Sequence, residues 1–115
     1  MTYRTVDPAS MAPARGPHPA ASPYDKDVAR ALGIRAFGSY QVELPPGAET
    51  VPHDHRSDGA EDMYAFVRGI GVVVVDGEEV PVNPGQFIAV TPESTRHVHA
   101  GESGLVFIAV CATPP

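Results

Sequence analysis

The chain has 115 residues, enough for one domain with a sizeable core. Its formal net charge is −6, and its few lysines and arginines are scattered, so it lacks the basic face of a nucleic-acid-binding protein. No apolar run approaches the ~20 residues of a membrane-spanning helix, and a single cysteine excludes an intrachain disulfide bond. We therefore expect a cytoplasmic protein that binds neither nucleic acid nor membrane.

Two segments precede the predicted strands. Residues 1–22 are rich in proline and alanine and have no apolar periodicity, which indicates an irregular arm. Ser22 and Pro23 are typical of the start of a helix, and Gly33 is typical of its end. The sequence therefore predicts a short helix over residues 23–32.

From residue 34 onward the sequence predicts strands. Apolar and polar residues alternate over residues 40–44, and the four valines of residues 72–75 suit a buried strand. Asp76-Gly77 is typical of a tight hairpin turn, and turns with glycine or proline separate the other strands. The predicted strands span residues 40–44, 50–55, 62–68, 72–75, 79–82, 87–90, 96–100 and 105–111. About eight short strands at this spacing indicate an antiparallel sandwich or barrel.

A group of potential metal ligands lies on these strands. His53 and His55 are two residues apart in an extended segment, so both imidazoles face the same side. Glu61 and Asp62 begin the next strand, where alternation allows only one of them to point inward. Inward positions of different strands converge in a small barrel, so His97 can join this group. Three imidazoles and one carboxylate suit a divalent transition metal and leave an octahedral ion with open positions.

These features resemble the two sequence motifs of the cupins, a family named for its antiparallel jelly-roll β-barrel. Residues 47–69 begin with glycine, place His-Asp-His after five further residues and end with glycine, as in the first cupin motif. Residues 84–97 resemble the second motif, which ends in histidine. The resemblance covers about residues 40–110. It implies that residues 23–115 form one all-β jelly-roll barrel domain behind the short helix, with residues 1–22 as an arm.

The carboxylate ligand has two candidates. The spacing of the first motif, counted back from Gly69, assigns the ligand to Asp62, although aspartate is one methylene shorter than the usual glutamate. Glu61 is the alternative, because inward-facing Glu61 would have apolar companions two and four residues on. We choose Asp62. The predicted metal ligands are then His53, His55, Asp62 and His97, and the ion implied by the resemblance is iron, manganese, nickel or zinc.

The resemblance implies a metal-dependent enzyme that acts on a small oxygenated organic molecule in the barrel mouth, as a dioxygenase, isomerase, lyase or cyclase does. Two residues are candidates for a catalytic role. His99 shares a strand face with His97 and can shuttle a proton, and Tyr64 shares a face with Asp62, where packing is its competing role. The alternative function is a non-catalytic cupin that binds or senses a small molecule around a structural metal. The resemblance also implies a homodimer.

Overall fold

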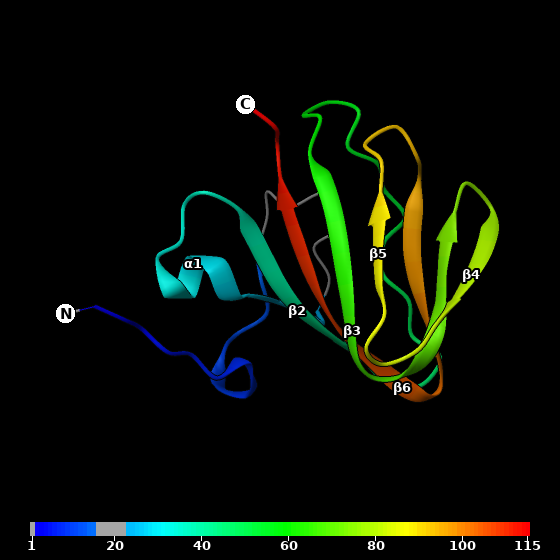
Figure 1. Ribbon diagram of the computed structural model, residues 1–115. Coiled ribbons are helices and arrows are strands. Elements are labelled where there is room, and N and C mark those ends of the chain that lie inside the picture. The colour runs from blue at the N-terminus through cyan, green and yellow to red at the C-terminus, as the bar shows by residue number, and fades with distance from the viewer. Residues whose placement is uncertain (1, 16–22) are drawn as a thin grey trace.

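The computed structural model describes residues 2–15 and 23–115. In these residues one antiparallel six-stranded sheet has the order β1-β2-β6-β3-β4, and β5 also pairs with β3 (Figure 1). The strands are β1 (Asp25–Asp27), β2 (Gly38–Leu44), β3 (Glu61–Val75), β4 (Glu78–Val82), β5 (Phe87–Val90) and β6 (Arg96–Ala112). The predicted antiparallel, mostly β fold is confirmed. The predicted closed barrel is not observed, because the strand order of the described residues ends at β1 on one side and β4 on the other.

β3 and β6 each combine two of the predicted strands. The predicted strand over residues 50–55 is not formed and β1 was not predicted, so the described residues form six strands in total. β3 and β6 pair along most of their length, with register shifts on either side of Arg68 and Gly69. Gly69 has a φ of 84°, and a Cβ atom there would lie 2.1 Å from the carbonyl oxygen of Gly104. Glycine at this point lets the chain adopt a positive φ and lets the backbones approach closely. Both strands can therefore bend without losing their pairing, as the base of Figure 1 shows.

The bend brings the two halves of the sheet together around an apolar core. In the first half of β3, buried Asp62, Tyr64 and Phe66 alternate with exposed Glu61 and Met63, as expected for a strand with one buried face. Both halves contribute to the core, whose buried members are Val42, Leu44, Tyr64, Phe66, Val73, Val82, Val98, Ala100, Leu105 and Phe107. Burying a side chain of this size contributes about 1.5–3 kcal/mol, so the core is the main source of stability.

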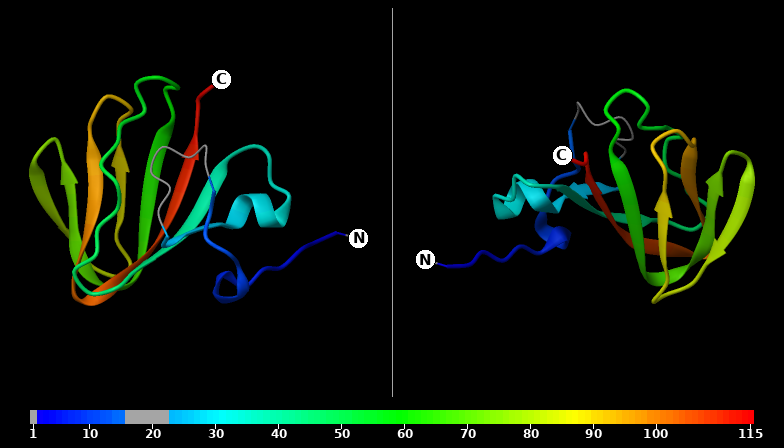
Figure 2. Two further views of the ribbon diagram at one scale, coloured as in Figure 1. Left: turned by 180° about the vertical axis from the view of Figure 1, so that it is seen from behind. Right: turned by 45° about the horizontal axis from the view of Figure 1, so that its top comes forward.

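The segment between β2 and β3 carries both histidines of the predicted site. It runs beside the first half of β6 (Figure 2) and forms isolated bridges, Glu49 to His99 and His53 to Arg96, in place of the predicted strand over residues 50–55. The amide of Thr50 also donates to the carbonyl of Val98 at 2.9 Å. These backbone hydrogen bonds determine which way each side chain of the segment points.

The N-terminal helix is shorter than predicted. Helix α1 spans Val28–Leu32, and the preceding residues form β1, which pairs with β2. The side chain of Asp27 accepts a hydrogen bond from the amide of Arg30 at 3.0 Å and so caps the helix, whereas the predicted cap, Ser22, lies outside the described residues. Gly33 ends the helix in the left-handed conformation, as predicted.

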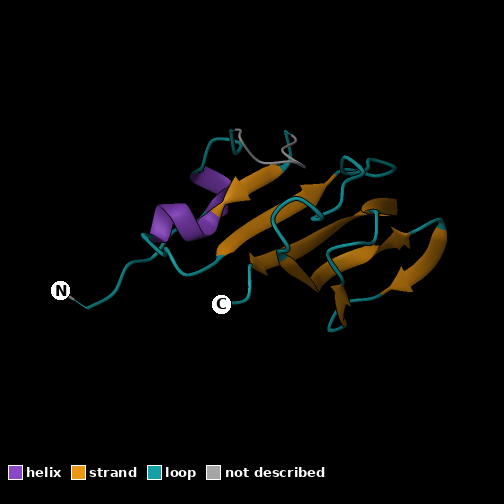
Figure 3. Ribbon diagram, turned by 90° about the horizontal axis from the view of Figure 1, so that it is seen from above, coloured by secondary structure: helices purple, strands orange, loops and turns teal. Residues whose placement is uncertain are grey.

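The arm of residues 1–22 is described only in part. Residues 2–15 contain one short 3-10 helix, η1 (Pro8–Ser10), and no other regular element. Both views in Figure 2 show this segment on the same side of the sheet as α1, and Figure 3 shows α1 next to β1. No helix of the described residues is long and apolar enough to cross a membrane.

Candidate metal centre

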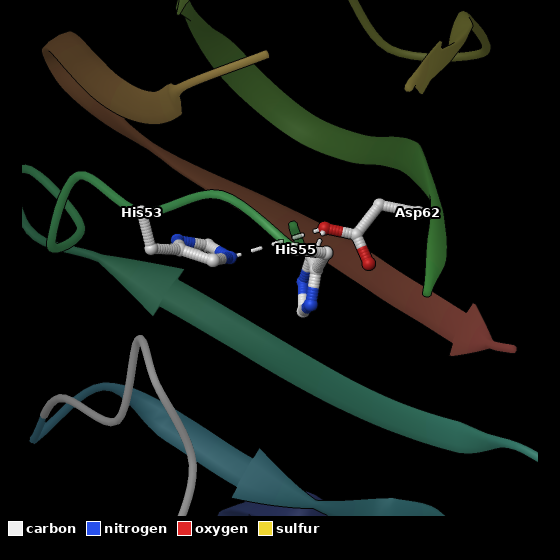
Figure 4. Close-up of side chains that lie close together, drawn as sticks. All are labelled: His53, His55 and Asp62. Atoms are coloured by element: carbon white, nitrogen blue, oxygen red, sulfur yellow. Dashed lines mark ion pairs between the residues drawn. The ribbon is translucent and has the colours of Figure 1, made fainter. Parts of the chain in front are cut away.

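Three of the predicted ligands, His53, His55 and Asp62, converge at one point (Figure 4). Their ligand atoms all lie within 4.8 Å of one another. The Oδ2 atom of Asp62 is 3.2 Å from Nε2 of His55 and 3.9 Å from Nε2 of His53. The two imidazole rings meet edge to face, with their centroids 5.0 Å apart. The segment before β3 therefore supplies two nitrogen atoms and β3 supplies one oxygen atom to a single point.

The strand register selects Asp62 rather than Glu61. Asp62 is only 6% exposed and shares the inner face of β3 with Tyr64, whereas Glu61 is exposed on the outer face. The predicted placement of Asp62 is thus the one observed. If Glu61 pointed inward, Met63 would point inward as well. Met63 is instead 40% exposed, and the larger aromatic side chains of the alternate positions fill the core.

Hydrogen bonds orient both imidazoles. The Nδ1 atom of His53 lies 3.1 Å from the carbonyl oxygen of Val51, and the Nδ1 atom of His55 lies 3.2 Å from Oδ1 of Asp58. A hydrogen bond from the amide of Ala60 is the main cause that lowers the pKa of Asp58, so this carboxylate is ionised. A carbonyl and a carboxylate can only accept, so each imidazole carries a proton on Nδ1 when neutral. The lone pair on Nε2 then points toward Asp62.

The donor set fits a divalent transition metal. Burial is the largest cause that lowers the pKa of His53, which keeps its imidazole neutral at neutral pH, the form that binds a metal. Two Nε2 atoms and a carboxylate oxygen are ligands that iron, manganese, nickel and zinc all accept in proteins. These three residues can hold such an ion, and the arrangement leaves its identity open.

Arg96 was not predicted to belong to the site, yet it contacts the carboxylate. Its Nη1 atom lies 2.5 Å from Oδ2 of Asp62, and its side chain is fully buried. The same oxygen also accepts a longer hydrogen bond, 3.4 Å, from the hydroxyl of Tyr64. The sequence contained a signal for the position of Arg96. Val98 and Ala100, two and four residues further on, are apolar, which indicates that the strand face they share with Arg96 points into the core.

His97 and His99 lie on the opposite face of β6 and do not join the cluster. The Nε2 atom of His97 is 3.6 Å from Oε2 of Glu49, and His99 is exposed. The expected convergence of His97 with the other ligands is therefore not observed, and neither is the expected position of His99 beside the metal. The physical reason is strand alternation, because Arg96 and Val98 occupy the inner positions of the same strand.

A small cavity that is open to solvent adjoins the three converging residues. Its apolar wall consists of Val42, Phe107 and Ala109, and its other lining residues beyond the cluster are Asp25, Tyr40, Thr50, Tyr64 and Cys111. Burial is the main cause that raises the pKa values of the Tyr64 hydroxyl and the Cys111 thiol, so both keep their protons at neutral pH. Among the described residues that line the cavity there is no lysine or arginine.

Comparisons with known proteins agree with this architecture. The family model described as "Cupin domain" matches residues 40–111, a span that includes all three converging residues. No curated protein sequence matches the chain.

Several solved structures share the fold. A cupin protein from Bacteroides fragilis has a TM-score of 0.77 at 19% sequence identity, covering 98% of this chain and 86% of that protein. A Cupin 2 conserved barrel domain protein from Salinispora arenicola has a TM-score of 0.70 at 17% identity, covering 97% of this chain and 88% of that one. A sugar phosphate isomerase of the cupin superfamily from Silicibacter pomeroyi has a TM-score of 0.65 at 23% identity, covering 79% of this chain and 59% of that one. At these identities the similarity concerns the fold.

Proposed function

Because this chain belongs to the cupin domain family, we propose that it is a metal-dependent enzyme that acts on a small oxygenated organic molecule. The observation that supports this proposal is the convergence of two imidazole nitrogens and one carboxylate oxygen beside a cavity. A metal held by His53, His55 and Asp62 would act as a Lewis acid toward an oxygen atom of the substrate. Reactions of this kind include those of isomerases, lyases, cyclases and dioxygenases.

The residues around the cluster have separate tasks in this proposal. The carbonyl of Val51 and the carboxylate of Asp58 keep both imidazoles in the orientation that a metal needs. Tyr64 stays protonated and donates its hydroxyl hydrogen to Asp62, so it helps to hold the carboxylate and cannot act as a base. Phe107 and its apolar neighbours exclude water from one side of the substrate.

The described side chains of the cavity offer a phosphate group no cationic partner besides the proposed metal. Its described lining contains two aspartates, Asp25 and Asp62, and no positively charged side chain that could pair with a phosphate. Arg96 does not line the cavity, because its guanidinium group is fully buried against Asp62. One similar structure is named a sugar phosphate isomerase, but an uncharged molecule with adjacent oxygen atoms suits this cavity better.

Elemental analysis tests the metal-dependent function. Protein purified without a metal-affinity column should contain about one divalent transition metal per chain. His53→Ala should lose this metal, because the variant lacks one of the three ligand atoms, whereas His99→Ala should keep it, because His99 is exposed on the other face. Absence of metal from the wild-type protein, together with no uptake of added Fe²⁺, Mn²⁺, Ni²⁺ or Zn²⁺, would contradict the proposal.

One observation favours the second candidate function, a non-catalytic cupin that binds or senses a small molecule around a structural metal. His99, the residue expected to shuttle a proton, is exposed away from the cavity, and Tyr64 is held protonated. Small molecules can be screened by adding them to the Co²⁺-loaded protein and recording its absorption spectrum. A molecule that changes the spectrum binds near the metal and is a ligand under either function. Conversion of such a ligand supports the enzyme, and binding without conversion by the loaded protein supports the sensor.

The proposal includes a homodimer in the cytoplasm, the location that the single cysteine favours. Outward-facing apolar side chains on neighbouring strands support self-association, since Met63 is 40% exposed and Phe87 is 67% exposed. Phe87 lies opposite Ala65 in the β3–β5 register, and Met63 lies opposite Val110 in the β3–β6 register, so the patch crosses three strands. In sedimentation experiments Phe87→Asp should be monomeric. A wild-type monomer at high concentration would contradict this assignment.

A further inference from the structure

Arg96 and His53 are cross-strand neighbours on the inner face. Their backbones exchange two hydrogen bonds, from the amide of His53 to the carbonyl of Arg96 at 3.1 Å and from the amide of Arg96 to the carbonyl of His53 at 2.9 Å. Residues paired in this way in an antiparallel ladder direct their side chains to the same face. Position 96 is therefore the place on β6 from which a side chain reaches the metal centre.

Hydrogen bonds to three different residues hold the Arg96 side chain behind the cluster. Nη1 donates to Asp62, Nη2 donates to the carbonyl oxygen of Thr91 at 2.6 Å, and Nε donates to the carbonyl oxygen of Ser94 at 3.2 Å. A buried guanidinium group is stable only when an anion and hydrogen-bond acceptors surround it, and Asp62 is the carboxylate that contacts it. The two side chains thus fix each other in position.

We infer that Arg96 occupies the place of a fourth protein ligand and orients Asp62, so that three side chains alone hold the metal. This inference rests on the proposed metal-dependent function. With three protein ligands, a six-coordinate ion keeps three positions for substrate and water. The two imidazoles are neutral when they bind a metal, and the positive charge of Arg96 balances the negative charge of Asp62. The protein groups of the site therefore have no net charge and do not offset the two positive charges of the ion. Such an ion attracts substrate oxygen atoms more strongly, and the protein binds it less tightly.

Counting the bound imidazoles tests this inference directly. Pulsed EPR of the Cu²⁺-loaded wild-type protein should detect two bound imidazoles, and His97→Ala should give the same count and the same affinity for Co²⁺ in competition with a chelator. A count of three that falls to two in His97→Ala would overturn the role of Arg96 and leave the metal-dependent function standing. If neither ion binds to the wild-type protein, both proposals fail.

A substitution at position 96 gives a second test. Arg96→His removes the positive charge and places an imidazole opposite His53, so it should raise the affinity for Co²⁺ about tenfold or more and raise the imidazole count to three. Arg96→Lys keeps the charge beside Asp62 and should keep two imidazoles and an affinity close to that of the wild type. Weaker Co²⁺ binding in a folded Arg96→His protein would overturn the inference. If that variant does not fold, the imidazole counts of the wild type and His97→Ala decide.

Discussion

The two faces of the first half of β6 differ in a way that determines the site. Within residues 96–100, Arg96 and Val98 point into the core, whereas His97 and His99 point outward. The segment around His53 shows the opposite arrangement, because its histidines are the residues that point inward. The presence of histidine in a motif therefore does not by itself make a ligand. The pairing register of the backbone decides whether a side chain reaches the metal centre.

The largest effect is expected from Asp62→Asn. The substitution removes a ligand atom and leaves the buried guanidinium of Arg96 without its anion, so it should lower the free energy of unfolding by about 3 kcal/mol and abolish metal binding. Urea denaturation of the metal-free protein measures the first effect, and titration with Co²⁺ measures the second.

Glu61→Gln is the matched control for that experiment, because Glu61 precedes Asp62 and is exposed on the outer face. Its free energy of unfolding should stay within about 0.5 kcal/mol of the wild type. If the two substitutions lowered the free energy of unfolding equally, the assignment of Asp62 to the inner face and Glu61 to the outer face of β3 would be wrong.

A smaller effect is expected from Asp58→Asn. The Asp58 carboxylate accepts a hydrogen bond from Nδ1 of His55, and loss of its charge should weaken metal binding about tenfold without abolishing it. Asp54→Asn is the control, because Asp54 accepts a hydrogen bond from the amide of Arg56 and pairs with the guanidinium group of the same residue. Competition with a chelator measures both affinities, and unchanged affinity in Asp58→Asn would remove Asp58 from the site.

The smallest effect concerns Tyr40, on the wall of the cavity. Burial, followed by the charge of Asp27, raises the pKa of Tyr40 to about 12 from 10.0. Because the folded-state pKa is raised, the stability contributed by the neutral phenol is fully present below pH 10 and is lost as the pH rises through about 12. Absorbance at alkaline pH should show two late-titrating tyrosines, Tyr40 and the more deeply buried Tyr64, and only the one near pH 12 should disappear in Tyr40→Phe. If Tyr40 titrated near pH 10, its burial in the cavity wall would be contradicted.

Much of the fold followed from local patterns. The alternation in residues 40–44 predicted β2, the Asp76-Gly77 turn joins β3 to β4, and Gly33 ends the helix. The eight separate strands of the prediction are not observed, because bends at glycine allow β3 and β6 to continue through positions that resemble turns in the local sequence. The early start of the helix was also wrong, because pairing with β2 extends Asp25–Asp27.

The sequence by itself determined the family and brought His53 and His55 together with a carboxylate of the same short motif, because the spacing within that motif is local. The register of β3 then decided for Asp62 over Glu61. Only the tertiary structure decided the partner from β6. His97 and Arg96 are adjacent, and a shift of one residue in a strand exchanges the inner and outer faces. The bridge between His53 and Arg96, formed by segments more than forty residues apart, sets that register and places a guanidinium group beside the carboxylate.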